Sequence, residues 1–540
     1  MGRTTGKPLV ADAICIGLIT LVTALPYVGS IGFYSDDWGL VGEFLQGRTS
    51  FADILGDYPG RPIQGAYILL LFKAFGLNPL GYHIVNTIVL GLCAIGLFAL
   101  LLRLRFSRTS AFATTVIFLV LPQLSTIRVW VATVQVPLSM LAALASMHAQ
   151  ISFMETRRRA WILWAVAAAV ISALSYEIFA ALILCFPIGL LLSRPNFSFR
   201  KIPRETLFLG IAILSAIALI VVVKLAISDR IEPISKLYPY LSVPLRAFDP
   251  HFDWHTESGP NLFAGFNVYV WQTLIGWVRA FVATVTARAG LAPILAALAA
   301  GGLTLWRLRS EPPSRPGRLA LAGVAVFLLG HVLFLVVGGF LLSPTGLSNR
   351  VTMAAMPGFA MLLVALLIWA AWLVPEPRRA LAFSCGVAVL VCVATTRLAI
   401  IENSWVDASD RQQVILSAAK RDLAAVPEGS TVILDGVCPY TGPGVVFETS
   451  WDVGPALSIV LDRQLAGDIL TERASVNEKG LETSLYGERT AYAYGTRLYV
   501  YRPHDHRVAH LTDAADARAY FSGRTPPDCP VSYPGQGELI

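Results

Sequence analysis

Long apolar runs separated by short polar stretches dominate the first 400 residues of the chain. A bilayer core of about 30 Å is crossed by roughly 20 apolar helical residues, and runs of this kind recur along the whole region. The pattern predicts eleven membrane-spanning helices, near residues 9–31, 82–102, 110–125, 133–153, 160–176, 178–193, 207–227, 289–306, 319–342, 351–373 and 380–400. The first run is interpreted as a retained signal anchor. The pair at 160–193, divided at Ser175, Tyr176 and Glu177, is interpreted as a tight hairpin, with one broken helix as the alternative.

The pattern changes after residue 401. Shorter segments follow there, some with the apolar spacing of helices and others with that of strands. Helical spacing occurs at residues 408–425 and 452–462. Strand-like segments lie at 431–436 and 497–502. We therefore expect two parts, a polytopic α-helical membrane domain at 1–401 and a small soluble α/β domain at 402–540.

Composition supports this division. Hydrophobic residues make up 55% of the 540 residues and charged residues only 14%, with a mean hydropathy of +0.63, so an ordinary water-soluble core is excluded. The net charge is +7, yet residues 401–540 hold 12 Lys and Arg against 19 Asp and Glu. The basic excess therefore belongs to the membrane part, where it sets orientation, and no nucleic-acid partner is needed to explain it.

Basic loops should alternate with neutral or acidic ones if cytoplasmic loops are the positive ones. They do, and the basic loops are 103–108, 155–161, 193–205, 306–318 and 375–379. The outward side then carries loop 1 (residues 32–81), an outer loop at 228–288 and the C-terminal domain. This places the N-terminus in the cytoplasm and the C-terminal domain outside an inner (plasma) membrane. There, Cys438 and Cys529 could form a disulfide.

One apolar segment, residues 266–288, does not fit this alternation as a span. Counting it as a span would reverse every later loop, so we expect an interfacial helix, which Trp271 and Trp277 would suit.

The first outward loop contains an acid pair, Asp36 and Asp37, in the sequence FYSDDWGLVGEF. Two adjacent carboxylates at a membrane surface are costly enough to indicate a function. The plainer interpretation is a solvated turn or an N-cap of the next helix.

The sequence that follows, GDYPGRPIQGAYILLLFKAFGLNPLGYHIVNTIVLGL, has an Arg61-Pro62 step before an amphipathic helix, and then His83 and Asn86. Across residues 34–95 this arrangement resembles the GT-C superfamily of membrane glycosyltransferases, especially the protein O-mannosyltransferases and the tetratricopeptide-bearing transmembrane mannosyltransferases. The resemblance implies that Asp36 is the general base, or a ligand of metal and acceptor, with Asp37 beside it.

Transfer from a phosphate leaving group also calls for a cation near the lipid headgroup, and three outward arginines are candidates: Arg61, Arg128 and Arg350. Interfacial snorkelling is the alternative for Arg61 and Arg128. Arg350, in SNR at the mouth of a late helix, is placed similarly to a basic phosphate ligand of GT-C members.

Glu177 lies between two apolar runs, so it is a candidate site residue by default. It could orient the acceptor, pair with Arg128, or join Asp36 in holding a divalent ion such as Mg²⁺ or Mn²⁺. His83 and Asn86 share one helical face, and they either support loop 1 or touch substrate.

The sequence thus predicts a glycosyltransferase, inverting as the resemblance implies, that takes a sugar from a polyprenyl-phosphate donor. The acceptor would be a hydroxyl of an envelope glycan, glycolipid or protein. A transporter or flippase of a lipid-linked saccharide and a non-catalytic envelope assembly protein are the alternatives.

Overall fold

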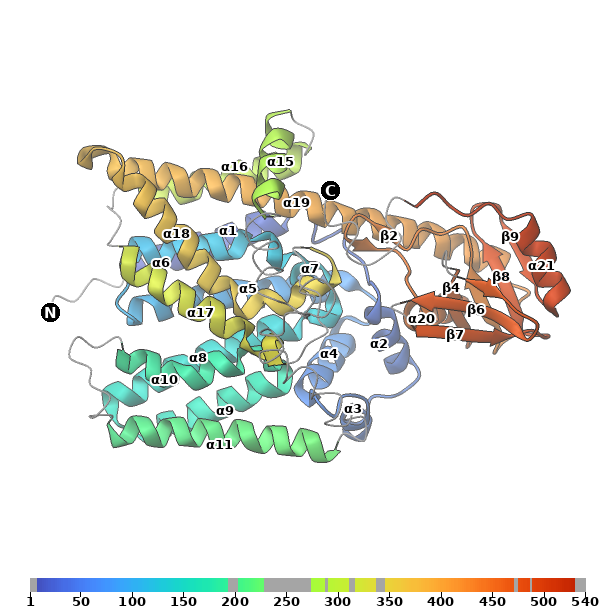
Figure 1. The fold of residues 1–540 in the computed structure, drawn as a ribbon, viewed down its shortest axis with the longest axis horizontal. Coiled ribbons are helices and arrows are strands. Elements are labelled where there is room, and N and C mark those ends of the chain that lie inside the picture. Colours follow the sequence, from blue (N-terminus) through green and yellow to red (C-terminus); the bar gives the residue numbers. More distant parts are fainter. Residues whose placement is uncertain are drawn as a thin grey trace, which may run out of the picture.

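The computed structural model describes residues 7–192, 203–227, 273–286, 290–309, 316–336, 345–470, 474–485 and 488–529. A bundle of helices forms the larger part, and a smaller α/β domain lies beyond one end of the bundle (Figure 1). Among the described residues, five helices are long and apolar enough to cross a membrane, or six if one bent pair counts as a span. The chain is therefore a multi-pass membrane protein, and the number of eleven spans stays a prediction because seven further apolar helices are shorter.

Loop 1 folds into three helices between the first two helices of the bundle. Ser50 and Asp53 form a capping box at the start of the second of these, and prolines begin the third and the bundle helix after it. The elements are α1 (Lys7–Ala24), α2 (Asp36–Leu45), α3 (Phe51–Asp57), α4 (Pro62–Phe75) and α5 (Pro79–Arg103).

The predicted span at 110–125 is wrong in one respect, because the helix breaks at Pro122. Two segments, Arg108–Val120 and Pro122–Val129, meet at a bend of 57°, as expected when a proline removes a helix hydrogen bond. The chain then passes through short turns before the next long helix. The elements are α6 (Arg108–Val120), η1 (Pro122–Leu124), α7 (Ser125–Val129), η2 (Val131–Thr133) and α8 (Gln135–Thr156).

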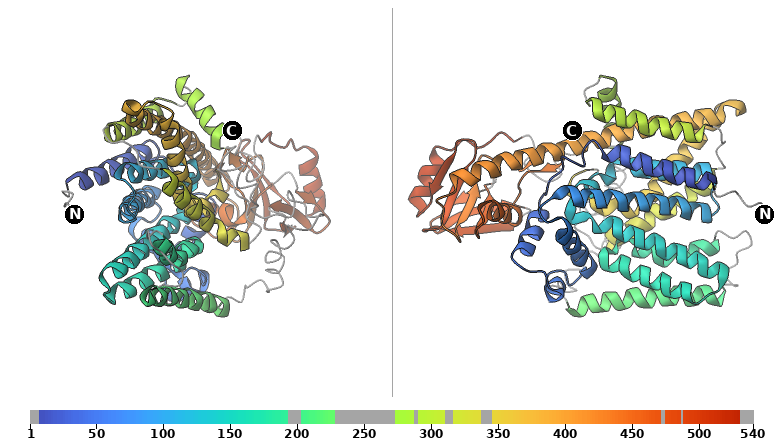
Figure 2. Two further views of the ribbon diagram at one scale, coloured as in Figure 1. Left: turned by 60° about the vertical axis from the view of Figure 1, so that its left-hand side comes forward. Right: turned by 180° about the vertical axis from the view of Figure 1, so that it is seen from behind.

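The next two helices meet at η3 (Glu177–Phe179) and run side by side (Figures 1 and 2), which is the hairpin of the two alternatives. The remaining helices are α9 (Ala160–Ser175), α10 (Ala180–Leu192), α11 (Arg204–Ile227), α15 (Thr273–Val285), α16 (Leu291–Leu308), α17 (Pro316–Val336), η6 (Leu347–Ala354), α18 (Met356–Trp372) and α19 (Glu376–Asp422). Within the predicted outer loop, residues 228–272, including Trp271, lie outside the described residues. Helix α15 packs on α19 and crosses it (Figure 1).

Helix α19 runs across the predicted domain boundary at 401/402. The predicted span at 380–400 and the predicted helix at 408–425 are one helix of 47 residues, which runs from the bundle into the C-terminal domain (Figures 1 and 2). The boundary therefore lies inside a continuous helix.

The C-terminal domain contains a four-stranded sheet in the order β4-β1-β8-β9. Strand β1 is parallel to both neighbours, and β9 closes the edge in the antiparallel sense. The predicted strands at 431–436 and 497–502 are confirmed as β1 and β8, and the predicted helix at 452–462 is α20. A disulfide joins Cys438 and Cys529. The elements are β1 (Thr431–Leu434), β2 (Tyr440–Thr441), β3 (Gly444–Val445), α20 (Ser450–Leu461), β4 (Ala466–Ile469), β5 (Ser475–Val476), β6 (Gly480–Leu485), β7 (Glu488–Ala493), β8 (Leu498–Arg502), β9 (Arg507–His510) and α21 (Ala514–Ser522).

Helices α17 and α18 approach through glycines, as small residues allow in membranes. A Cβ atom on Gly358 would overlap the backbone of Phe327 and Gly323. We expect Gly358→Ala to destabilise the fold by about 1–3 kcal/mol, the usual cost of overpacking, measured by thermal melting in detergent. Gly302→Ala in α16 is the control, because no atom lies within 4 Å of the added carbon; equal losses in the two variants would contradict the expectation.

Candidate active site

Loop 1 begins with a tight turn that places Asp36 at its third position. The amide of Asp37 donates to the carbonyl of Tyr34 over 2.9 Å, and Ser35 has φ 47° and ψ −122°. These angles are those of the second residue in a type II′ turn, where glycine is preferred. A serine in this region costs about 1–3 kcal/mol of backbone strain, so other contacts hold the turn.

Asp37 supplies one such contact. Its side chain is fully buried and accepts three backbone N–H groups, from Tyr34 at 2.9 Å, Val131 at 3.2 Å and Ala132 at 2.6 Å. Burial raises the pKa of Asp37 and these donors act against the rise. Asp37 therefore joins loop 1 to η2, and its two oxygens are already occupied.

Asp36 is in the opposite situation, since its side chain is exposed. Within the described part of the chain it makes no hydrogen bond or ion pair. The protein atoms packed around the exposed carboxyl still exclude part of its water, which raises the pKa of Asp36, and the positive charge of Arg350 lowers it. Asp36 is thus an available carboxylate within the electrostatic influence of Arg350.

Arg350 reaches this position on an aromatic support. Its guanidinium carbon lies 5.1 Å from the centre of the Trp130 ring, and Nη1 donates to the carbonyl of Leu347 over 2.7 Å. The indole of Trp130 in turn donates to the carbonyl of Tyr34 over 3.0 Å. The turn that precedes Asp36 and the guanidinium of Arg350 therefore contact the same tryptophan.

The segment that carries Arg350 is fastened to the broken helix. The side chain of Asn349 donates to Ser125 Oγ over 2.8 Å, and Thr126 Oγ1 donates to the carbonyl of Gly346 over 2.5 Å. These polar contacts lie inside the bundle, where unpaired groups are costly. Polar contacts thus join the segment after the break at Pro122 to η6 and the residue before it.

Arg61 and Glu177 form a second cluster. Nε and Nη2 of Arg61 bind the two carboxylate oxygens of Glu177 at 3.1 and 2.7 Å, and the Lys224 ammonium lies 3.5 Å from the same carboxylate. The Arg61 guanidinium also covers the Tyr176 ring at 4.3 Å. The sequence-based alternative that Glu177 pairs with Arg128 is therefore wrong.

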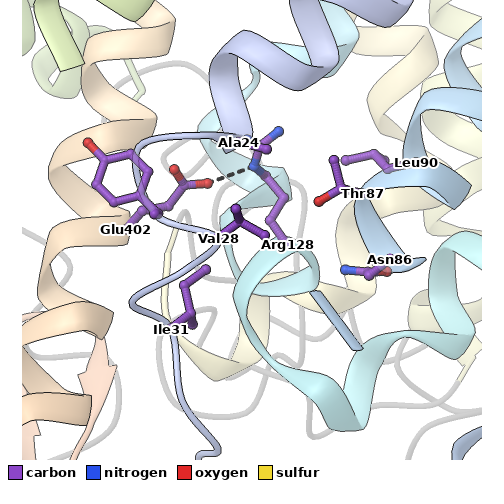
Figure 3. Close-up of a pocket in the computed structure, with 9 residues that line it drawn as sticks. Ala24, Val28, Ile31, Asn86, Thr87, Leu90, Arg128 and Glu402 are labelled. Atoms are coloured by element: carbon purple, nitrogen blue, oxygen red, sulfur yellow. Dashed lines mark hydrogen bonds and ion pairs between the residues drawn. The ribbon is translucent and has the colours of Figure 1, made fainter. Parts of the chain in front are cut away.

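Arg128 instead pairs with Glu402 of α19 (Figure 3). The Nε–Oε1 distance is 2.6 Å, and Nη2 donates to the carbonyl of Thr23 over 2.9 Å. Only 8% of Arg128 is exposed. The adjoining cavity of about 10 Å³ is the size of one water molecule, so it is too small for a sugar or a lipid phosphate.

His83 and Asn86 are also buried, at 1% and 2% exposure. His83 Nε2 contacts the carbonyl of Gly32 at 3.2 Å, and Asn86 donates to the carbonyl of Ile127 over 2.6 Å. They connect α5 to the start of loop 1 and to α7. This geometry favours support of loop 1 over contact with substrate.

A larger cavity of about 440 Å³ lies between α5, α8, α10, α17 and α18. Its lining is almost entirely apolar, with Arg318 the charged exception. A site that binds and orients a polar substrate needs several polar groups that converge on it. This cavity therefore is not the candidate site.

The predicted divalent ion finds no ready ligand set. The carboxylate of Glu177 is held by Arg61 and Lys224, and no three His, Cys, Asp or Glu side chains among the residues placed by the structure are grouped to hold a metal.

Sequence reasoning missed Trp130, Glu402 and the strained Ser35. Glu402 offered a signal, since it follows an apolar run and a buried acid needs a cation. Trp130 stands two residues after Arg128, but nothing in the sequence assigns it to Arg350. The strain at Ser35 is visible only in the backbone.

No protein-family model and no curated protein matches the chain. Similar solved structures exist. ArnT from Cupriavidus metallidurans bound to undecaprenyl phosphate is 13% identical, with 87% of each chain covered and a TM-score of 0.44; its apo state is 15% identical, with 86% of each chain covered and a TM-score of 0.36. The apo oligosaccharyltransferase of Archaeoglobus fulgidus is 12% identical over 85% of this chain, with a TM-score of 0.38. The present chain spans 64% of that protein's length.

Proposed function

We propose that this protein is a GT-C-type glycosyltransferase that moves a sugar from a polyprenyl-phosphate donor to an acceptor hydroxyl on the outer face of the membrane. The observation that carries the proposal is the arrangement of Asp36 and Arg350. The Asp36 carboxylate lies within the electrostatic influence of Arg350, and Trp130 contacts both the Arg350 guanidinium and the turn that precedes Asp36. The resemblance of loop 1 implies the role of base for Asp36, and the position of Arg350 at the mouth of a late helix is similar to that of a basic phosphate ligand in GT-C members.

In this reaction Asp36 accepts the proton of the acceptor hydroxyl while the oxygen of that hydroxyl attacks the anomeric carbon of the sugar. The bond between that carbon and the phosphate oxygen breaks, and the electron pair leaves with the polyprenyl phosphate. Arg350 stabilises the negative charge that grows on this oxygen. A single displacement of this kind inverts the configuration of the anomeric carbon.

Two features support an outward-facing site. Charge alternation places loop 1 and the SNR segment outside, and the Cys438–Cys529 disulfide is typical of domains in oxidising compartments. The donor would present its phosphate to Arg350 from the bilayer side. The acceptor would then be an envelope glycan, glycolipid or protein.

The test uses the purified full-length chain in lipid nanodiscs. Undecaprenyl phosphate carrying a labelled pentose, hexose or hexosamine is offered with a cell-envelope extract, and products are followed by mass spectrometry. We expect acceptor-dependent release of undecaprenyl phosphate and transfer of the label. Transbilayer movement of an intact donor in vesicles would indicate a flippase instead, and inactivity toward the whole panel would favour an assembly protein.

Arg350→Gln tests the phosphate ligand. A charge-assisted hydrogen bond to phosphate is worth about 1.5–3 kcal/mol, so binding of undecaprenyl phosphate should weaken about 10- to 100-fold, measured by native mass spectrometry titration. Arg378→Gln is the control, because Arg378 is exposed at the start of α19. Unchanged binding in Arg350→Gln would remove Arg350 from the site.

The same substitution should change the pH dependence of kcat/KM. The base works as a carboxylate, so activity falls as pH falls through the pKa of Asp36. Arg350 lowers this pKa, and its removal should shift the acid limb of the profile to higher pH. A shift to lower pH would contradict the assignment of Asp36 as base.

A further inference from the structure

The turn before Asp36 is held by the C-terminal domain. Ser35 Oγ donates to Glu448 Oε1 over 2.5 Å, and the indole of Trp451 donates to Ser35 Oγ over 3.2 Å. Both partners lie more than 400 residues further along the chain, and Ser35 is almost fully buried. The strained residue of the turn is thus bound on two sides from outside loop 1.

Glu448 is itself fixed in place. Its Oε2 accepts from the Tyr440 hydroxyl over 2.7 Å, and its backbone amide donates to Asp452 Oδ2 over 2.8 Å. Asp452 also accepts the amide of Thr449 and so completes a capping box at the start of α20. The backbone of Glu448 is therefore anchored to a helix terminus, and Tyr440 orients its carboxylate.

Helix α20 packs closely against α2, the helix that begins at Asp36. A Cβ atom on Gly42 would lie 3.2 Å from Pro455 Cβ, and one on Gly39 would lie 3.1 Å from the carbonyl oxygen of Trp451. Glycines at these positions allow the two helices to approach closely. The contact sets the position of α2 as well as that of the turn.

We propose that Glu448 is a positioning residue of the active site, which keeps Ser35 in its strained turn and thereby directs the Asp36 carboxylate. The inference rests on the proposed function. Without the carboxylate, Ser35 would relax toward negative φ and carry Asp36 with it. Since a misplacement of about 1 Å can cost 10²-fold in rate, the reaction requires the C-terminal domain.

The experiment uses the full-length chain in nanodiscs with the labelled donor that gives turnover in the panel. Glu448→Ala and Ser35→Ala should each lower kcat by about 10- to 100-fold, while KM for the donor changes little, because Arg350 and the bilayer side are untouched. Glu428→Ala is the matched control, since Glu428 is an exposed glutamate of the same domain. Wild-type kcat in Glu448→Ala would overturn the proposal.

The Ser35→Gly substitution distinguishes a positioning role of Glu448 from a general loss of stability. Glycine adopts positive φ without strain, so Ser35→Gly added to Glu448→Ala should raise kcat about tenfold over Glu448→Ala alone. Equal kcat in the single and double variants would also overturn the proposal. If Glu448→Ala does not accumulate, Ser35→Gly and Ser35→Ala decide, with the glycine variant expected to be about tenfold faster and equal rates counting against the proposal.

Failure of this inference can be distinguished from failure of the proposed function. If Asp36→Asn keeps full transfer activity, Asp36 is not the base and the proposed mechanism falls with it. If Asp36→Asn loses activity while Glu448→Ala does not, only the positioning role is wrong.

Discussion

Replacing Asp36 by asparagine is expected to lower kcat by about 10²- to 10⁴-fold, the contribution typical of a general base. The substitution keeps the shape of the side chain and removes only its ability to accept the proton. Because Asp36 makes no hydrogen bond or ion pair with the residues that the structure places, the melting temperature and the binding of undecaprenyl phosphate should hardly change. The measurement is acceptor-dependent sugar transfer at saturating donor.

Two controls define this result. Asp462→Asn alters an exposed aspartate with φ 52° in the C-terminal domain, where asparagine fits well, and should leave transfer intact. Asp37→Asn should lower stability and transfer together, because an amide cannot accept the three N–H groups around it as a carboxylate does. Normal transfer by Asp36→Asn would contradict the assignment of the base.

Replacing Arg128 by methionine should destabilise the protein by about 3–5 kcal/mol, because it leaves the buried Glu402 carboxylate without its cation. Unfolding in detergent, followed by circular dichroism, measures the loss. Activity should fall only as far as the folded fraction falls, since the cavity beside Arg128 is too small for substrate.

The double variant Arg128→Met/Glu402→Leu tests this interpretation. Exchanging both members of a buried ion pair for apolar side chains is often nearly neutral, so the second substitution should recover most of the stability and the activity. A double variant that is stable but inactive would restore Arg128 as a phosphate ligand.

The apolar pattern predicts the membrane architecture because the thickness of the bilayer fixes the length of a span. The division into a bundle and a C-terminal α/β domain follows from the change in period near residue 401. The continuity of α19 did not follow, because a helix that leaves the membrane changes from apolar to polar without changing its backbone. Pattern alone places a boundary wherever hydropathy falls.

Within the site, sequence reasoning singled out Asp36 and Arg350 from residue type, charge alternation and the resemblance to GT-C glycosyltransferases. It could not pair the charges, because Arg128 and Glu402 are 274 residues apart and no spacing rule relates them. It also could not show from contacts that Asp37 is held by backbone amides while Asp36 is available. That division depends on three backbone amides, from Tyr34, Val131 and Ala132, whose directions exist only in the folded chain.

The length of α19 has a consequence for how an acceptor arrives. At 1.5 Å per residue, its 47 residues form a strut of about 70 Å, and no glycine or proline interrupts it after Gly386. Helices bend sharply only at such residues or at comparable defects, so the C-terminal domain has no hinge on which to swing open. For the proposed transferase, we therefore expect the acceptor to reach Asp36 from the side while the C-terminal domain keeps its position.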